Sequence, residues 1–235
     1  MEKQKIITLS QHFNLSETTN AVVRNTDIAR RLKDLDIENI EQMEFPDGTF
    51  NSYYDCLSIL GIGTFGIVIS AVDKLDGQLC AIKIIKKNRI SESGMQDIRK
   101  EADILAALNH INIVQFKKVS ESEDYFLIVM ELVRGGSLRK LLSKRTLRKH
   151  PLIEEEVRIL MKNILEAVQH LHSNNVIHRD LKLENILLDD FKNLSSVRIA
   201  DFGLSVQRDL FVSDKCGTLL YMAPEQASKA AYSYV

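Results

Sequence analysis

After residue 53, the chain contains five short runs of apolar and β-branched residues separated by polar or glycine-containing segments. The runs cover residues 55–60, 67–72, 79–85, 113–118 and 125–132. Runs of this length and composition are typical of β-strands. The pair Asp76-Gly77 lies between the second and third runs and favours a tight hairpin turn. The pattern therefore predicts a small sheet of five strands.

Two other segments repeat apolar residues at helical spacing. The first opens at Ser93-Gly-Met-Gln96, which has the Ser-x-x-Gln form of a capping box. The second follows three consecutive glutamates, residues 154–156, which favour a helix N-terminus. The predicted apolar stripes are Met95, Ile98, Ala102, Leu105 and Leu108 in the first helix, and Val157, Leu160, Met161, Ile164, Leu165, Val168 and Leu171 in the second. The order indicates a sheet with one helix, followed by a helical part.

The first 51 residues differ from the rest of the chain. Residues 10–20 are rich in Ser, Thr and Asn, and residues 26–43 place apolar side chains only partly at helical spacing. Pro46-Asp47-Gly48 is a turn signal. We therefore expect residues 1–51 to form an N-terminal extension, partly helical or disordered, that either lies on the following domain or binds a partner.

The composition excludes several classes of protein. Apolar residues make up 45% of the chain and charged residues 27%, as in ordinary globular proteins. The formal charge of −1 argues against nucleic-acid binding. The strongest apolar run, residues 126–130, is too short to cross a membrane, and we expect neither a signal peptide nor membrane association. Three widely spaced cysteines without metal-ligand spacing favour a reducing compartment, so we expect a cytoplasmic protein, with the nucleus as the alternative.

A glycine-rich loop lies between the first two predicted strands. It has the pattern G-x-G-x-x-G-x-V, and its candidate binding residues are Gly61, Ile62, Gly63, Gly66 and Val68. A dinucleotide-binding loop would be followed by a helix and, about 20 residues on, by an acid. A strand-like run and Lys83 stand there instead. The loop is therefore either a flap that closes over phosphates or a plain turn.

Lys83 and Glu101 form a candidate pair. Lys83 lies in an apolar strand, where a lysine more often faces solvent, and Glu101 lies near the apolar stripe of the first predicted helix. If both point into one cleft, the carboxylate would fix the ammonium group against two phosphates.

The most specific motif is His178-Arg-Asp-Leu-Lys-Leu-Glu-Asn185, which matches H-R-D-L-x-x-x-N. In it, Asp180 can accept the proton of an attacking hydroxyl, Lys182 can neutralise a transferring phosphoryl group, and Asn185 can reach a metal ion. Asp201-Phe-Gly203 follows 21 residues after Asp180, and its aspartate is the second expected ligand of Mg²⁺. Ala223-Pro-Glu225 closes the segment.

Taken in order, these motifs resemble those of eukaryotic protein kinase catalytic domains, from about residue 53 to the end of the chain. The resemblance implies an α+β, bilobal fold. Residues 52–133 would form the N-lobe, a five-stranded antiparallel sheet with one helix, and the hinge. Residues 134–235 would form an incomplete, mainly helical C-lobe. ATP and Mg²⁺ would bind between the lobes.

The resemblance also implies roles for several apolar residues. Met130 would be the gatekeeper, and Glu131 and Val133 the hinge that meets adenine. The residues expected to sandwich the adenine ring are Val68, Ala81 and Leu187, and those expected to stack as a regulatory spine are Leu105, Phe116, His178 and Phe202. Each of these is also a reasonable core residue.

The resemblance further indicates the substrate and its regulation. Lys182 and Thr218 match serine/threonine kinases, so the expected substrates are Ser- or Thr-bearing proteins. Asn109-His-Ile-Asn-Ile-Val114 and Lys215-Cys-Gly-Thr218 look similar to the calcium/calmodulin-dependent group, although neighbouring groups share them. Glu184 predicts at most a modest preference for a basic residue near the phosphoacceptor. Arg179 implies control by an anion, supplied either by phosphorylated Ser213 or by Asp214.

The chain departs from the family pattern at its end. It stops at Val235, where the family continues with further helices, so we expect a fragment of a longer kinase with an exposed apolar patch on the second helix. The predicted activity is transfer of the ATP γ-phosphoryl group to Ser/Thr hydroxyls. The alternative is a catalytically incompetent fragment or pseudokinase that acts as a nucleotide-binding or interaction module. The oligomeric state cannot be predicted from the sequence.

Overall fold

A computed structural model describes residues 40, 43–63, 66–207, 216–228 and 231–233 of the chain. The predicted helix over residues 26–43 lies almost wholly outside this part, as do Ser213, Asp214 and the last two residues. The described residues form two compact units. Residues up to Met95 together with Lys117–Leu132 belong to the first unit, and Gln96–Phe116 together with the residues from Val133 onward belong to the second.

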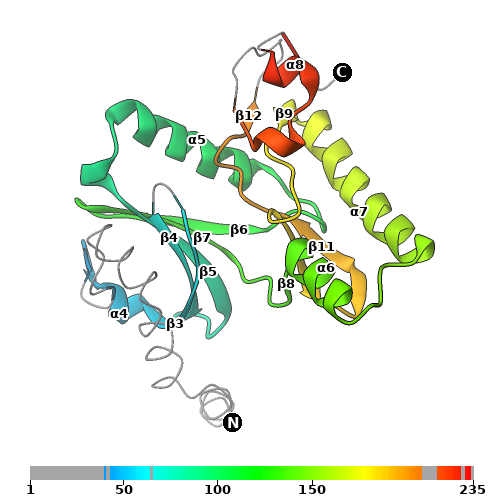
Figure 1. Cartoon of the computed structure of the whole chain (residues 1–235). Coiled ribbons are helices and arrows are strands. Elements are labelled where there is room, and N and C mark those ends of the chain that lie inside the picture. Colours follow the sequence, from blue (N-terminus) through cyan, green and yellow to red (C-terminus); the bar gives the residue numbers. More distant parts are fainter. Residues whose placement is uncertain (1–39, 41–42, 64–65, 208–215, 229–230, 234–235) are drawn as a thin grey trace. The chain divides into compact units, whose positions relative to one another are not determined.

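The first unit is built on a five-stranded sheet (Figure 1). Its strands, in spatial order, are β3 (Tyr54–Ile62), β4 (Gly66–Asp73), β5 (Leu79–Lys86), β7 (Tyr125–Glu131) and β6 (Phe116–Glu121). The pairs β3–β4, β4–β5 and β5–β7 are antiparallel. Gly77 adopts a φ of 69° in the turn between β4 and β5, which confirms the predicted hairpin. The fourth predicted strand begins later than expected, because Ile113 forms an isolated bridge with Ile199 instead.

The side chains of this sheet divide between two faces, because neighbouring residues of a strand point to opposite sides. One set is fully buried in a core cluster: Ile67, Ile69, Ala71, Cys80, Ile82, Ile84, Leu127 and Val129. In the antiparallel register, Val68 lies opposite Lys83, and Ala81 lies opposite Met130. These four residues therefore share the other face of the sheet.

Residues 43–53 complete the core of the first unit. They form β1 (Glu44–Phe45), β2 (Gly48–Thr49) and the short helix α4 (Phe50–Tyr53). Met43, Phe45 and Phe50 are buried in the same cluster as the sheet residues, and the rings of Phe50 and Tyr54 lie 5.1 Å apart. The expected end of the extension at residue 51 thus falls inside a helix, and residues 43–50 pack as part of this unit.

The helix α5 (Glu92–Ala107) begins two residues before the position that the capping box predicts. The hydroxyl of Ser91, not that of Ser93, accepts the bond from a first-turn backbone group, the N–H of Gly94, at 3.2 Å. The predicted stripe is otherwise correct, since Ile98, Ala102 and Leu105 are buried.

The second unit combines helices with short strands (Figure 1). Its longer helices are α6 (Leu138–Leu147) and α7 (Glu154–Ser173). Strands β8 (Gly136–Ser137), β10 (Ile186–Asp190) and β11 (Asn193–Ile199) form a three-stranded sheet in the order β11-β10-β8. Strands β9 (Val176–Ile177) and β12 (Val206–Gln207) pair antiparallel, and η3 (Leu219–Tyr221) and α8 (Pro224–Ala227) follow. The α+β, two-part fold is as predicted.

The core of the second unit lies between α6, α7 and the three-stranded sheet. It contains Leu138, Leu141, Leu160, Ile164, Ile186, Leu188, Leu194 and Val197. Of the seven residues in the predicted stripe on α7, Leu160 and Ile164 lie in this core, Val168 packs against it, and Leu171 is also buried. Val157, Met161 and Leu165 are exposed at 42%, 45% and 57%, respectively, which agrees with the apolar patch expected on this helix.

Candidate active site

The loop between β9 and β10 carries the H-R-D motif and is fixed from inside the unit. His178 is 3% exposed, and its ring lies 5.0 Å from that of Phe202. The backbone N–H of Asp180 donates to Nδ1 of His178 at 3.3 Å. Nε2 is therefore the protonated ring nitrogen, and its N–H donates a hydrogen bond to the carbonyl oxygen of Ala200 at 3.1 Å. Burial lowers the pKa of His178, so the ring is neutral and serves as a spacer rather than as a charge.

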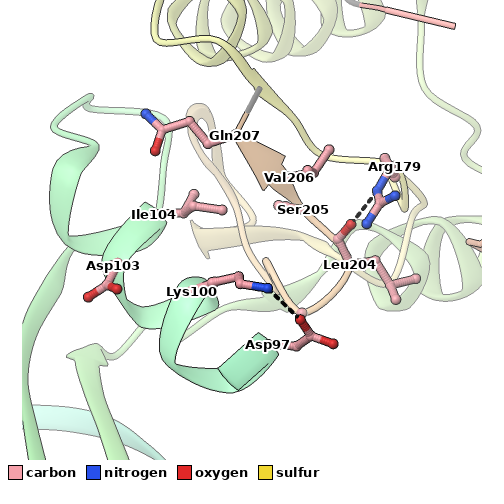
Figure 2. A pocket seen from close by; sticks show the side chains of 10 residues that line it. Asp97, Lys100, Asp103, Ile104, Arg179, Leu204, Ser205, Val206 and Gln207 are labelled. Carbon is pink, nitrogen blue, oxygen red and sulfur yellow. Dashed lines mark hydrogen bonds and ion pairs between the residues drawn. The ribbon is translucent and has the colours of Figure 1, made fainter. Parts of the chain in front are cut away.

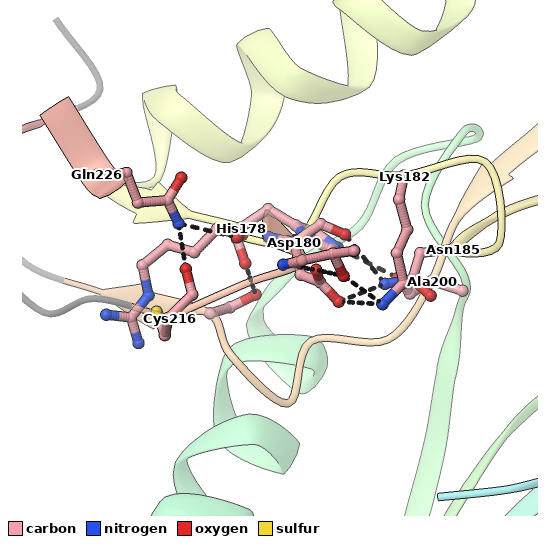
Figure 3. A network of polar contacts seen from close by, with 10 residues as sticks. His178, Asp180, Lys182, Asn185, Ala200, Cys216 and Gln226 are labelled. Atoms are coloured by element: carbon pink, nitrogen blue, oxygen red, sulfur yellow. Dashed lines mark hydrogen bonds and ion pairs between the residues drawn. The ribbon is translucent and has the colours of Figure 1, made fainter. Parts of the chain in front are cut away.

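Three side chains converge on the carboxylate of Asp180, as Figure 3 shows in part. Oδ1 accepts from the backbone N–H of Thr218 at 2.9 Å and from its hydroxyl at 2.7 Å. Oδ2 accepts from Nζ of Lys182 at 2.6 Å and from Nδ2 of Asn185 at 3.1 Å. Lys182 also donates to the hydroxyl oxygen of Thr218 at 3.0 Å, which closes the network.

These bonds determine the charge of Asp180. Burial alone would raise the pKa of this carboxyl, but the hydrogen bonds from Lys182 and Thr218 outweigh it and hold the pKa below the ordinary 3.8. The carboxylate is therefore ionised at neutral pH. It has the charge and the fixed orientation that a proton acceptor needs.

The oxygens expected to hold Mg²⁺ are supplied by Asn185 and Asp201. The side-chain nitrogen Nδ2 of Asn185 donates to Asp180, which leaves the side-chain oxygen Oδ1 as the atom able to bind a cation. Asp201 is exposed, and the backbone N–H of its neighbour Ala200 donates to the backbone carbonyl oxygen of Asn185 at 2.9 Å. Such hard oxygen donors fit Mg²⁺, which takes its remaining ligands from phosphate and water. Among the described residues, no group of three or more His, Cys, Asp or Glu could hold a metal by itself.

The position of Thr218 depends on two residues that the sequence analysis missed. Gly217 has a φ of 109°, and a Cβ at this position would lie 2.5 Å from the carbonyl oxygen of Arg179. Nε2 of Gln226, on α8, donates to the carbonyl oxygens of Arg179 at 3.1 Å and of Cys216 at 2.5 Å. Gln226 thus ties the segment before Thr218 to the H-R-D loop (Figure 3). The only signal of its role in the sequence is its place directly after Ala-Pro-Glu.

A pocket of about 470 Å³ lies between α5 and the segment after Asp201 (Figure 2). Its lining includes Asp97, Lys100 and Asp103 of α5 and the segment Gly203–Gln207. The guanidinium of Arg179 also lines it, and its Nε donates to the carbonyl oxygen of Leu204 at 2.5 Å. Arg179 is therefore oriented toward this segment, but both candidate anions, Ser213 and Asp214, lie outside the described residues, and control by an anion stays a prediction.

The glycine loop belongs to the first unit, where the three glycines differ in what they require. A Cβ at Gly66 would lie 1.9 Å from the carbonyl oxygen of Ile84, whereas no heavy atom lies within 4 Å of such a Cβ at Gly61. At Gly63 the nearest atom is 3.8 Å away, and the backbone N–H of Gly63 donates to the carbonyl oxygen of Gly66 at 2.8 Å. Position 66 therefore has no room for a side chain, because β4 and β5 approach each other closely there.

The sheet face opposite the core cluster carries most of the nucleotide residues predicted for the first unit. Gly61 lies opposite Val68, on the face that also carries Lys83. Ile62 differs, because it lies opposite Ile67 and packs against the core cluster. Its side chain therefore points away from the predicted nucleotide contacts, and only its backbone remains a candidate.

The predicted site residues are divided between the two units. Those in the first unit are Gly61, Ile62, Gly63, Gly66, Val68, Ala81, Lys83, Met130 and Glu131, and those in the second are Glu101, Val133, Asp180, Lys182, Asn185, Leu187 and Asp201. Hydrogen bonds join Asp180, Lys182 and Asn185 directly. The pairing of Lys83 with Glu101 stays a prediction. So does the binding of one ATP molecule by site residues from both units.

Residues 54–235 match the family model of the protein kinase domain. The chain therefore belongs to the protein kinase family, and the resemblance inferred from its motifs is confirmed. It is 42% identical over 182 residues to NUAK family SNF1-like kinase 1 of Homo sapiens. The aligned region covers 76% of this chain and 26% of that protein. The chain is 33% identical over 232 residues to serine/threonine-protein kinase 33 of Mus musculus, covering 94% and 46%, respectively.

A third relative is myosin light chain kinase A of Dictyostelium discoideum, which is 38% identical over 181 residues, covering 76% of this chain and 60% of that protein. The chain thus spans between about a quarter and three fifths of the length of these relatives. The family and the class of serine/threonine kinases are shared with proteins that are considerably longer. No helix among the residues described here is both long and apolar enough to span a membrane.

Proposed function

We propose that this chain transfers the γ-phosphoryl group of ATP to serine or threonine hydroxyls of protein substrates. The observation that supports the proposal most strongly is the ionised carboxylate of Asp180, held by Thr218, Lys182 and Asn185. In the transfer, the substrate hydroxyl oxygen forms a bond to the γ-phosphorus, the bond from that phosphorus to the bridging oxygen breaks, and ADP leaves. Asp180 orients the hydroxyl and accepts its proton.

The network around Asp180 suggests how a substrate hydroxyl enters. A carboxylate offers about four lone-pair sites, and four donors already occupy those of Asp180. A substrate hydroxyl must therefore replace one of them. Lys182 is the donor best suited to move, because its ammonium group can leave Oδ2 and still keep its bond to Thr218. The same ammonium group is then available to neutralise the transferring phosphoryl group.

The remaining roles follow from the family. Mg²⁺, when bound, neutralises charge on the phosphates, and Asn185 and Asp201 would hold it. Lys83, oriented by Glu101, would bind phosphate oxygens beneath the glycine loop. The adenine ring would lie among Val68, Ala81 and Leu187, with backbone contacts from Glu131 and Val133 next to Met130. The expected compartment is the cytoplasm or the nucleus.

An interaction module is the second candidate function. The exposed apolar residues Val157, Met161 and Leu165 on α7 favour contact with another protein or chain segment, which does not require catalysis. A chain with this function would bind ATP, or a partner, without transferring phosphate.

The variant Asp180→Asn tests both functions. It should abolish transfer of phosphate from radiolabelled ATP to a mixture of Ser and Thr peptides, while the rise in unfolding temperature caused by ATP and Mg²⁺ is retained. Asp189→Asn is the matched control, because Asp189 pairs with Arg134 through a 3.2 Å bond outside the network. A wild-type chain that gains stability from ATP but transfers nothing would favour the interaction module, and an active Asp180→Asn variant would refute the mechanism.

A further inference from the structure

Arg139, the second residue of α6, is bound to the loop that carries Asp180. Its backbone N–H donates to the carbonyl oxygen of Leu183 at 3.1 Å. Its guanidinium donates from Nε to Oε1 of Glu184 at 2.8 Å and from Nη2 to the hydroxyl of Tyr221 at 3.0 Å. Arg139 therefore joins α6 both to the loop after Asp180 and to the segment after Thr218.

A protein substrate with its hydroxyl at Asp180 must pass close to this arginine. Glu184 follows Asp180 by four residues, a chain length of at most about 14 Å. An extended peptide advances about 3.3 Å per residue, so side chains three or four residues from the phosphoacceptor can reach the same surface. The side chains of Arg139 and Glu184 are 50% and 45% exposed, which leaves both accessible to a peptide.

The guanidinium of Arg139 changes what Glu184 can bind. Nε of Arg139 lies 2.8 Å from Oε1 of Glu184, so the two groups form an ion pair. The carboxylate of Glu184 therefore faces a positive charge in direct contact. A lysine or arginine of a substrate gains little Coulomb energy from a charge that is already neutralised.

The helix α6, on which Arg139 lies, and the residues that follow it carry further positive charge. Residues 138–150 contain no Asp or Glu, and their cations are Arg139, Lys140, Lys144, Arg145, Arg148 and Lys149. Arg145 pairs with Glu156 at 2.7 Å, and Nζ of Lys144 lies 5.0 Å from the ring centroid of Phe191. Lys140, which follows Arg139 in sequence, is exposed. The exposed start of α6 therefore carries positive charge, which favours an anion over a cation.

We propose that Arg139 determines substrate specificity by occupying Glu184 and selecting peptides with a carboxylate side chain near the phosphoacceptor. The inference rests on the proposed kinase function. It reverses the modest basic preference that Glu184 alone predicts. The substrate that would bind beside the basic residues of α6 is therefore an acidic Ser/Thr peptide.

Pairs of serine peptides that differ only by Glu or Lys at one position test this proposal, with the variable position moved along both sides of the serine. We expect the wild-type chain to have the higher kcat/KM for the Glu peptide at one or more positions. Arg139→Gln should shift the Glu/Lys ratio toward Lys by about tenfold, the size of one charge-assisted hydrogen bond. The double variant Arg139→Gln/Glu184→Gln should lose this shift, because the freed carboxylate of Glu184 is then absent.

Arg158→Gln is the matched control, since Arg158 forms an exposed ion pair with Glu155 on α7. It should leave the ratio unchanged. Fluorescence anisotropy of the same peptides, labelled with fluorescein, measures the ratio of affinities without phosphate transfer, so a failure of the kinase function does not hide the result. An Arg139→Gln ratio equal to that of the wild type, a wild-type preference for Lys, or no binding of either peptide would overturn the proposal.

Discussion

The hydroxyl of Thr218 donates a hydrogen bond of 2.7 Å to Oδ1 of Asp180, which lies 38 residues earlier in the chain. The backbone N–H of the same threonine donates to the same oxygen at 2.9 Å. One residue thereby fixes both the charge and the direction of the proposed catalytic carboxylate. The segment that ends in Ala-Pro-Glu therefore acts on the H-R-D loop directly.

Thr218→Val keeps the shape of the side chain but removes its hydroxyl. We expect the pKa of Asp180 to rise and the carboxylate to lose its fixed orientation, since one of its four donors is absent. A lost hydrogen bond to a charged group corresponds to a fall in kcat of about tenfold to hundredfold. Steady-state phosphate transfer measures the effect, and Thr218→Ser, which keeps the hydroxyl, should retain most of the rate. Equal rates for the two variants would contradict this role of the hydroxyl.

The glycine loop contains one glycine in a crowded position, Gly66, and one in an open position, Gly61. Gly66→Ala and Gly61→Ala compare the effect of an added Cβ on stability at these two positions. The new Cβ at position 66 would lie 1.9 Å from the carbonyl oxygen of Ile84, so β4 and β5 must move apart. Overpacking of this kind costs about 1–3 kcal/mol of unfolding free energy. The new Cβ at position 61 meets no heavy atom within 4 Å. Thermal unfolding should therefore show a lower midpoint for Gly66→Ala only, and identical midpoints would argue against the close approach of the two strands.

His178 should make the folded chain sensitive to mild acid. Burial lowers its pKa below the ordinary 6.5, so below that pH the unfolded chain binds a proton that the folded chain does not. The free energy of unfolding should accordingly fall as the pH is lowered through 6.5, by up to about 1.4 kcal/mol per pH unit until the folded pKa is reached.

His178→Phe keeps a ring beside Phe202 but cannot titrate. Denaturant unfolding at several pH values should therefore show a weaker loss of stability in acid for this variant than for the wild type. Burial also lowers the pKa of His172, but less of that side chain is enclosed. His172→Phe should thus remove a smaller part of the pH dependence. An unchanged slope in His178→Phe would refute the assignment of the acid sensitivity to His178.

The strands and the longer helices could be predicted from the sequence because their periodicities are local. The end of a helix is less certain, as Ser91 and Ser93 are both good capping residues and only the backbone geometry decides between them. The composition around Ile113 predicts a strand, but Ile113 forms a single bridge with Ile199, a residue too distant in sequence for any local pattern to indicate. The packing of Phe50 into the core was hidden by the polar residues around it.

The residues of the catalytic loop could be predicted because a contiguous motif carries them. Gln226 and Arg139 could not, because their roles depend on partners far along the chain. Gln226 reaches Arg179 across 47 positions, and Arg139 reaches Glu184 across 45. A glutamine after Ala-Pro-Glu or an arginine at the start of a helix has no distinguishing chemistry until the fold brings these partners together.

The division of β5 between two faces limits how the length of this chain can change. Ile82 and Lys83 are neighbours in sequence but belong to opposite faces of the sheet. Inserting or deleting a single residue within β5 would exchange the two sets, moving isoleucines to the face of Lys83 and turning the lysine toward the core cluster that contains Phe50. Insertions and deletions should therefore be confined to the turn around Asp76-Gly77, where Leu75 is already 89% exposed and no strand register is disturbed.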